Sequence, residues 1–206
     1  MTNHQVLRKQ LQTAPNKETL ATRTLAVMEA LPEYYQPLHQ VAPHYPSIHQ
    51  RLKFLETHAQ GNILDIGCYD GFFSLALAYH HKVTGIDMLH ACIAQANNNI
   101  NGQQYKPTFQ QSFAEALPFD NARFDTTIIS HTLEHVFDDE QALKEAVRVT
   151  RPTGTIIVIL PTSLGDDPTH LRYIPPTLTR QRLQKYGTTT EAITVGKGIG
   201  HICTKQ

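Results

Sequence analysis

The sequence contains few cysteines and lacks long apolar runs. Cys68, Cys92 and Cys203 are odd in number, and no two of them form a CxxC pair. Neither a disulfide framework nor a zinc knuckle is therefore expected. The first twelve residues are polar and lack the apolar stretch of a signal peptide. The apolar run at residues 156–160 is far too short to cross a bilayer. We therefore predict a reduced, cytoplasmic protein with no membrane association.

Neither sign of charge is in excess. Eighteen basic residues balance eighteen acidic ones, giving a formal net charge of +0 at pH 7. A protein whose main task is to grip phosphate backbones needs a net basic face, so nucleic acid is disfavoured as a partner. One local basic patch stays open, formed by Arg148, Arg151, Arg172, Arg180, Arg182 and Lys185.

Apolar strands alternate with helical patterns through most of the chain, which at 206 residues is long enough for one domain. Strands are predicted at residues 62–66, 82–86, 105–111, 124–130 and 155–160. Helices are predicted at residues 51–58, 72–79, 89–100, 138–150 and 177–186. Such alternation indicates a parallel sheet covered on both faces. Near the end, the glycines at 196 and 198 predict a hairpin between residues 191–195 and 199–204.

The first fifty residues follow a different pattern. Residues 19–31 carry a loose helical stripe, and Pro32, Pro37, Pro43 and Pro46 then exclude a long helix. We therefore divide the chain into an N-terminal helical extension or lid at residues 1–50 and a main domain at residues 51–206. An extension that only wraps the domain, with no part in catalysis, is an equally good interpretation.

The most informative segment joins the first predicted strand to the next helix. Residues 63–66 are followed by Gly67 and Gly71 in a turn at the carboxyl end of the strand, where open α/β sheets bind ligands. The second strand ends in Asp87, about twenty residues after the turn, where a carboxylate can accept hydrogen bonds from both ribose hydroxyls. Together these features predict a nucleoside-containing ligand.

The turn does not suit a dinucleotide. A pyrophosphate needs bare backbone in a GxGxxG pattern, whereas Cys68, Tyr69 and Asp70 stand between the two glycines here. Asp65 and Asp70 would repel a pyrophosphate but attract the cationic amino-acid end of a sulfonium compound. S-adenosylmethionine is therefore favoured over NAD, and a nicotinamide oxidoreductase is the less favoured alternative.

Five segments resemble, in sequence order, parts of one enzyme family. They are the glycine turn at residues 65–71, the strand with its ribose acid at 83–87, the adenine-side loop at 114–125, the segment at 130–136 and the turn at 148–154. The family is the class I S-adenosylmethionine-dependent methyltransferases, of the small-molecule, methyltransferase-11-like type. The resemblance implies a doubly wound, Rossmann-like α/β fold with a seven-stranded sheet whose last two strands form an antiparallel hairpin.

The resemblance also implies a function and a cofactor site. The expected reaction is transfer of a methyl group from S-adenosylmethionine to a small-molecule acceptor by in-line displacement. A catalytically silent S-adenosylmethionine-binding module and an RNA or other nucleic-acid methyltransferase are the alternatives. The predicted cofactor-binding residues are Asp65, Gly67, Cys68, Tyr69, Gly71, Asp87, Met88, Phe113, Ala114, Glu115 and Ser130.

Two of these positions depart from the family pattern. Tyr69 stands where the family usually has another small residue, so its ring is expected to tighten the turn or line the pocket. Phe113 stands where an aspartate often accepts a hydrogen bond from the adenine amino group. We therefore expect adenine to be held here by stacking and backbone contacts near Ala114 and Glu115.

The best candidates for contact with the acceptor are His131 and His170. Each follows a strand at the carboxyl edge of the sheet, where cofactor and acceptor should meet. Methyl transfer from a sulfonium needs in-line placement and exclusion of water, and it needs a base only if the acceptor must lose a proton. Contact with the acceptor is therefore predicted more strongly than a role as general base.

No metal is predicted. Residues 131–135 match an HxxEH pattern, but that pattern must lie on a helix to bind zinc, and here it directly follows a strand. A second set, Glu134, His135 and His170, resembles positions that RNA 3′-end methyltransferases of related fold occupy with glutamate and histidine. The matching acid would have to stand at position 131, which is histidine here, so metal-assisted transfer is the weaker alternative.

Overall fold

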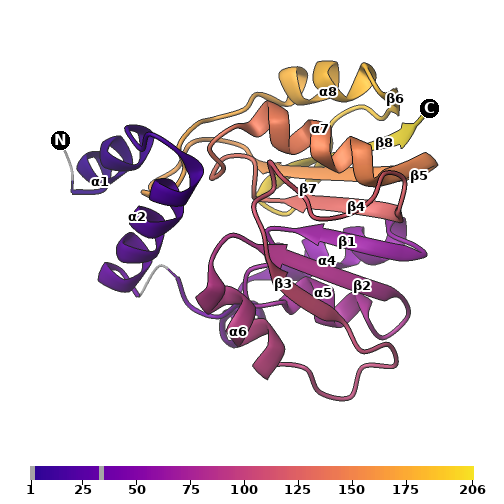
Figure 1. The fold of residues 1–206 in the computed structure, drawn as a ribbon, viewed down its shortest axis with the longest axis horizontal. Coiled ribbons are helices and arrows are strands. Elements are labelled where there is room, and N and C mark those ends of the chain that lie inside the picture. Colours follow the sequence, from indigo (N-terminus) through magenta and orange to yellow (C-terminus); the bar gives the residue numbers. More distant parts are fainter. Residues whose placement is uncertain (1–2, 33–34) are drawn as a thin grey trace.

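The computed structural model describes residues 3–32 and 35–206. The chain forms one twisted sheet flanked by helices, and two N-terminal helices lie beyond one end of the strands (Figure 1). The predicted extension at residues 1–50 includes positions 1–2 and 33–34, which lie outside the described residues. Its role as a lid is taken up below with the functional site.

The sheet contains eight strands in the described part of the chain. Their order is β3-β2-β1-β4-β5-β8-β6, and β7 also pairs with β8. Strands β1 to β5 pair in parallel, whereas β8 is antiparallel to β5. The bounds are β1 Asn62–Ile66, β2 Lys82–Asp87, β3 Thr108–Gln111, β4 Phe124–Ser130, β5 Thr150–Pro161, β6 Gly187–Thr189, β7 Ile193–Val195 and β8 Gly198–Lys205. The order reverses between β1 and β4, which is where doubly wound sheets bind ligands.

The expected seven-stranded sheet is confirmed, because two of the eight strands, β6 and β7, together occupy one edge position of the sheet. Strand β8 pairs with β5 along one edge, so β6 and β7 both lie along its other edge, separated by residues 190–192. The predicted hairpin is also confirmed, because β7 and β8 are joined through Gly196, which has a φ of 61°. That left-handed conformation suits glycine at a tight turn.

Alternate residues of the central strands build two cores on opposite faces of the sheet. Ile63, Ile128 and Ile157 pack on one face with α4 (Pro46–His58) and α5 (Phe72–Leu77). Leu64, Ile129 and Ile156 pack on the other face with α7 (Asp139–Val149). Further helices are α6 (His90–Asn98) and α8 (Pro176–Gln184). The predicted parallel sheet covered on both faces is therefore confirmed.

Helix α7 begins as its sequence predicts. The Asp138 side chain accepts a 2.9 Å hydrogen bond from the backbone N–H of Gln141, and Asp139 and Glu140 lie in the first turn. These acids compensate the positive end of the helix and its free N–H groups. The helix fixes the end of the segment 131–138, which contributes to the site described below.

The N-terminal segment contains one helix that the sequence did not predict. Helix α1 (Asn3–Gln12) packs against α2 (Lys17–Ala30) through Leu11, Leu20 and Val27, and Leu171 from the main domain completes this cluster. A polar ten-residue helix is marginal alone. Leu7 and Leu11 lie one turn apart on the face that packs on α2, a signal that the polar composition of the segment masked.

Helix α4 starts earlier than expected. The sequence placed Pro46 among the interruptions and began the helix at residue 51, but α4 runs from Pro46 to His58 after α3 (Leu38–Val41) and η1 (Ala42–His44). Proline fits the first turn of a helix because its missing N–H is not needed there. Ile48 and Leu55 of α4 are buried against the sheet, so this helix crosses residue 50 as one packed unit.

Candidate functional site

A cavity of about 290 Å³ lies at the carboxyl ends of β1, β2 and β4. Gly67 and Asp87 line it from the sheet side. Thr24, Met28 and Tyr35 line it from the N-terminal segment, which therefore forms part of its wall. The cavity size is at the lower end of the usual range for small-molecule sites, which is ~300–1,000 Å³.

The glycine turn after β1 is shaped by close packing. Gly67 has a φ of 77°, its N–H donates to Ile86 O at 2.8 Å, and a Cβ added to it would overlap the side chain of Thr132. The Thr132 hydroxyl in turn donates to Ile66 O at 2.9 Å. The end of β1 is therefore fixed against the segment after β4, and bare backbone faces the cavity.

Asp87 lies at the end of β2 as predicted, with its carboxylate held by two backbone donors. Its Oδ2 accepts from Tyr69 N at 3.1 Å, and its Oδ1 accepts from Leu89 N at 2.9 Å. Burial raises the pKa of Asp87 to about 6. Each carboxylate oxygen keeps acceptor capacity beyond one backbone bond, so the group can still receive a ligand hydroxyl from the cavity.

Asp65 is a second acid that lines the cavity. Its carboxylate accepts a 2.5 Å hydrogen bond from Ser74 Oγ, and burial raises its pKa to about 6. Asp70 behaves differently from the expectation that it would face a ligand. It is fully buried and accepts backbone hydrogen bonds from Leu38 at 2.6 Å and Phe72 at 3.2 Å. Its charge therefore stabilises the N-terminal segment and the start of α5.

Most of the predicted cofactor residues line this single cavity. They are Asp65, Gly67, Cys68, Tyr69, Asp87, Met88, Ala114, Glu115 and Ser130. Gly71 and Phe113 are not among the residues that line it. Gly71, at φ 80°, opens α5 and would collide with Phe109 if it carried a Cβ, whereas the Phe113 ring has the Lys17 ammonium 5.0 Å from its centroid. For these two, a direct cofactor contact stays a prediction.

Tyr69 links the glycine turn to the N-terminal segment. It has a φ of 51°, and its hydroxyl donates a 2.8 Å hydrogen bond to the backbone carbonyl of Tyr35. The ring lines the cavity, as its departure from the family pattern suggested. A small residue at this position would leave the segment over the cavity without that anchor.

Arg51 is a site residue that the sequence analysis missed. It projects from α4 into the cavity, and its guanidinium carbon lies 4.8 Å from the centroid of the Phe73 ring. Burial lowers its pKa to about 10, opposed by the nearby charges of Glu134 and Asp65. Among the described residues no carboxylate forms an ion pair with it, so the guanidinium can still pair with an anionic group of a ligand. An arginine near the start of a predicted amphipathic helix carries no sequence signal for this role.

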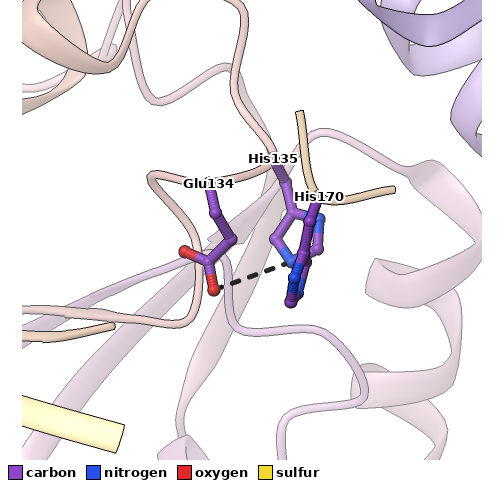
Figure 2. Close-up of side chains that lie close together, drawn as sticks. All are labelled: Glu134, His135 and His170. Atoms are coloured by element: carbon purple, nitrogen blue, oxygen red, sulfur yellow. Dashed lines mark ion pairs between the residues drawn. The ribbon is translucent and has the colours of Figure 1, made fainter. Parts of the chain in front are cut away.

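Figure 2 shows a second group of side chains, Glu134, His135 and His170, with the carboxylate directed toward two imidazoles that meet edge to face. The ring centroids of His135 and His170 are 4.8 Å apart, at an interplanar angle of 67°. Burial raises the pKa of Glu134 to about 8 and lowers that of His135 to about 4. Ligand atoms of all three residues lie within 4.8 Å of one another, as a metal ion would require.

His131 lies beside this group. It lines the cavity, has a φ of 56°, and places Nδ1 3.5 Å from Glu134 Oε1. Burial holds its pKa well below the usual value, so the ring is neutral at pH 7. His170 is not among the cavity-lining residues, although His135 is. Of the two predicted acceptor histidines, the structure therefore places only His131 on the cavity wall.

Five of the six residues of the basic patch left open by the sequence are ion-paired, and only Lys185 has no ion pair among the described residues. Arg148 pairs with Glu145, Arg151 with Asp125, and Arg180 with Glu191. Arg172 and Arg182 share Asp139. Cations already paired with carboxylates offer little to a phosphate backbone, which weakens the nucleic-acid alternative.

A family model described as a methyltransferase domain matches residues 64–158. The matched span contains the glycine turn, Asp87 and Glu134 with the segment around it. This segment therefore resembles the class I S-adenosylmethionine-dependent methyltransferases, the family that the sequence motifs indicated. Members of this family use S-adenosylmethionine as the methyl donor, in agreement with the cofactor predicted from the turn.

Two curated relatives show how far this likeness extends. The chain is 35% identical over 125 residues to a ubiquinone biosynthesis O-methyltransferase of Coxiella burnetii, covering 59% of this chain and 51% of that protein. It is 32% identical over 148 residues to a demethylmenaquinone methyltransferase of Lactobacillus johnsonii, covering 63% of this chain and 60% of that protein. The chain thus spans between half and two thirds of the length of these relatives.

Solved structures agree on the fold. A S-adenosylmethionine-dependent methyltransferase from Thermotoga maritima, described as a possible histamine N-methyltransferase, aligns with a TM-score of 0.70 at 18% identity. That alignment covers 88% of this chain and 99% of the other. In the described parts of the chain, no helix combines the length and the apolar character that a membrane span needs.

Proposed function

We propose that this protein transfers a methyl group from S-adenosylmethionine to a small-molecule acceptor bound in the same cavity. The observation that carries the proposal is the Asp87 carboxylate at the end of β2, which faces the cavity next to the bare backbone of Gly67. The Asp87 carboxylate suits the hydroxyls of a ribose, and the bare backbone of Gly67 leaves room for the amino-acid chain attached to that ribose. The names of the two curated relatives support a small-molecule acceptor.

The residues around the cavity suit the chemical groups of this cofactor. Asp87 would accept the ribose hydroxyls, and Ala114 and Glu115 would border the adenine. Ser130 Oγ is buried and has no hydrogen-bond partner among the described residues, so it is free to bond the amino-acid end of the cofactor. Arg51 would pair with the carboxylate at that same end, because a buried unpaired guanidinium favours an anion.

A bound S-adenosylmethionine supplies a methyl group on a sulfonium, and the chain's own task is placement and exclusion of water. The N-terminal segment serves that task in our proposal. Tyr69 and Asp70 hold it over the cavity through Tyr35 and Leu38, and α2 contributes Thr24 and Met28 to the lining. We propose on this basis that residues 1–50 act as a lid.

His131 and His170 are proposed to act on the acceptor side. His131 lines the cavity and is neutral, so it can accept a hydrogen bond or a proton from an acceptor group. His170 does not line the cavity, so it would act on the acceptor through its ring contact with His135. Its Nδ1 donates a 2.7 Å hydrogen bond to Leu164 O. A cytoplasmic location also belongs to the proposal, and it is supported by three free, buried cysteines.

The test is calorimetric titration with S-adenosylmethionine and with S-adenosylhomocysteine, followed by turnover of labelled methyl donor over a panel of phenols, quinols, amines and carboxylic acids. Binding of both cofactor forms and turnover of at least one acceptor are expected. No binding at millimolar ligand would overturn the proposal. Binding without turnover over the whole panel would instead support a catalytically silent module.

A further inference from the structure

We propose that Glu134, His135 and His170 form a binding site for one divalent transition-metal ion, with Zn²⁺ as the ion that suits these ligands. The sequence offered no acid at position 131 and so predicted no metal. The structure brings three other ligand atoms together without that position. Metal binding by these residues is independent of the methyl-transfer proposal and can be measured without cofactor or acceptor.

The carboxylate of Glu134 is the first argument. It is 1% exposed, and neither Oε1 nor Oε2 has a hydrogen-bond partner among the described residues. The nearest imidazole nitrogens, His131 Nδ1 and His135 Nε2, lie 3.5 Å and 3.9 Å from Oε1. A buried carboxylate without hydrogen-bond partners is costly, and a bound cation would compensate its charge and satisfy the oxygen that ligates it.

The two histidines are the second argument, because a backbone carbonyl fixes the Nδ1 side of each ring and so orients Nε2. His135 Nδ1 lies 3.1 Å from Thr169 O, and His170 Nδ1 lies 2.7 Å from Leu164 O. A carbonyl oxygen can only accept, so both Nδ1 atoms must carry the proton. Each Nε2 therefore keeps its lone pair, and such a carbonyl–histidine arrangement is typical of metal ligands.

The geometry needs little adjustment. The three ligand atoms lie within 4.8 Å of one another, whereas tetrahedral bonds of ~2.0–2.1 Å place ligands roughly 3.4 Å apart. Side-chain movements of about 1 Å would close that gap. Two imidazoles and one carboxylate form the ligand set of several zinc enzymes, and this set leaves a fourth position open.

The open position has a defined surrounding. His135, Asp167 and Thr169 line the cavity proposed to hold the cofactor and the acceptor, so the ion would lie at the wall of that cavity. The fourth ligand would be water or an oxygen of a small molecule in the cavity. His131, beside Glu134, would orient the carboxylate from the other side.

Zinc titration of tag-free, chelator-stripped protein against a chromophoric competitor tests the site. One equivalent of Zn²⁺ should bind, and Co²⁺ in its place should give the visible absorption of a four- or five-coordinate ion. Glu134→Gln, His135→Ala and His170→Ala should each weaken binding by more than the ~10- to 100-fold that loss of an outer-shell partner costs. The double variant Glu29→Gln/His49→Ala, which removes the same side-chain types from exposed positions, should bind like the parent.

Two outcomes would overturn the site: no stoichiometric Zn²⁺ on the parent, or parental affinity in all three ligand variants. S-adenosylhomocysteine titration of the same preparations reports folding, and it shows separately whether the cofactor proposal holds. If the ligand variants do not fold, X-ray absorption of the Zn²⁺-loaded parent decides. Two imidazoles and no sulfur support the site, whereas thiolate ligation would assign the ion elsewhere.

Discussion

The buried carboxylate of Asp70 accepts a 2.6 Å hydrogen bond from the backbone N–H of Leu38, thirty-two residues earlier in the chain. This bond joins the turn after β1 to the segment that covers the cavity. Tyr69, the preceding residue, makes a second tie through its hydroxyl to Tyr35 O. Two hydrogen bonds therefore join the glycine turn to the N-terminal segment, and a ligand in the cavity would contact both.

Asp70→Ala should loosen the N-terminal segment while leaving the sheet intact. The change leaves the Leu38 N–H without its acceptor and costs about 1–3 kcal/mol, the usual penalty for a buried unsatisfied group. We expect that loss in urea unfolding, together with faster protease cleavage near residues 31–38. Ala substitution of the exposed Asp166 is the matched control. An unchanged cleavage rate would show that this bond does not hold the segment.

Asp87→Asn should remove a pH dependence of cofactor binding. The pKa of Asp87 is raised by burial to about 6, and ribose hydroxyls need the ionised acceptor. In the parent, the Kd of S-adenosylhomocysteine should therefore rise about tenfold per pH unit as the pH falls below about 6, and stay level above it. The variant should bind weakly over the whole range, without that slope. Calorimetry across this range checks both, and an equal slope in the variant would assign the titration to another group.

Arg51→Ala should discriminate between two ligands that share an adenosine. S-adenosylhomocysteine carries a carboxylate, whereas 5′-methylthioadenosine does not. We expect about a 10- to 100-fold loss for the first ligand, since a hydrogen bond to a charged group contributes ~1.5–3 kcal/mol, and no change for the second. Lys53→Ala, on the exposed face of the same helix, is the control. Equal losses for both ligands would mean that Arg51 shapes the cavity without binding the carboxylate.

The sequence predicted the sheet and the turn because their signals are local. The alternation of strand and helix patterns predicted β1 and β2. The glycines predicted the turn at Gly67, and the place of an acid at the end of a strand predicted the position of Asp87. Arg51 was missed because its role depends on packing between segments far apart in sequence, and helix α1 was missed because its composition is mostly polar. Asp70 was placed toward the ligand because sequence shows that a turn is acidic but not which way each carboxylate points.

His131→Ala and His170→Ala test the acceptor side. His131 lines the cavity as a neutral ring, and replacing it should lower kcat while leaving the Kd of S-adenosylhomocysteine unchanged. The low pKa makes His131 a weak base, so the loss should be on the order of 100-fold or less, at the lower end for general acid–base groups.

His170→Ala should lower kcat through the His135 side, and added Zn²⁺ should not restore it. His49→Ala, at an exposed position, is the control for both. Parental turnover in both variants would remove histidine from the acceptor site and leave alignment by the lid as the main contribution of the protein.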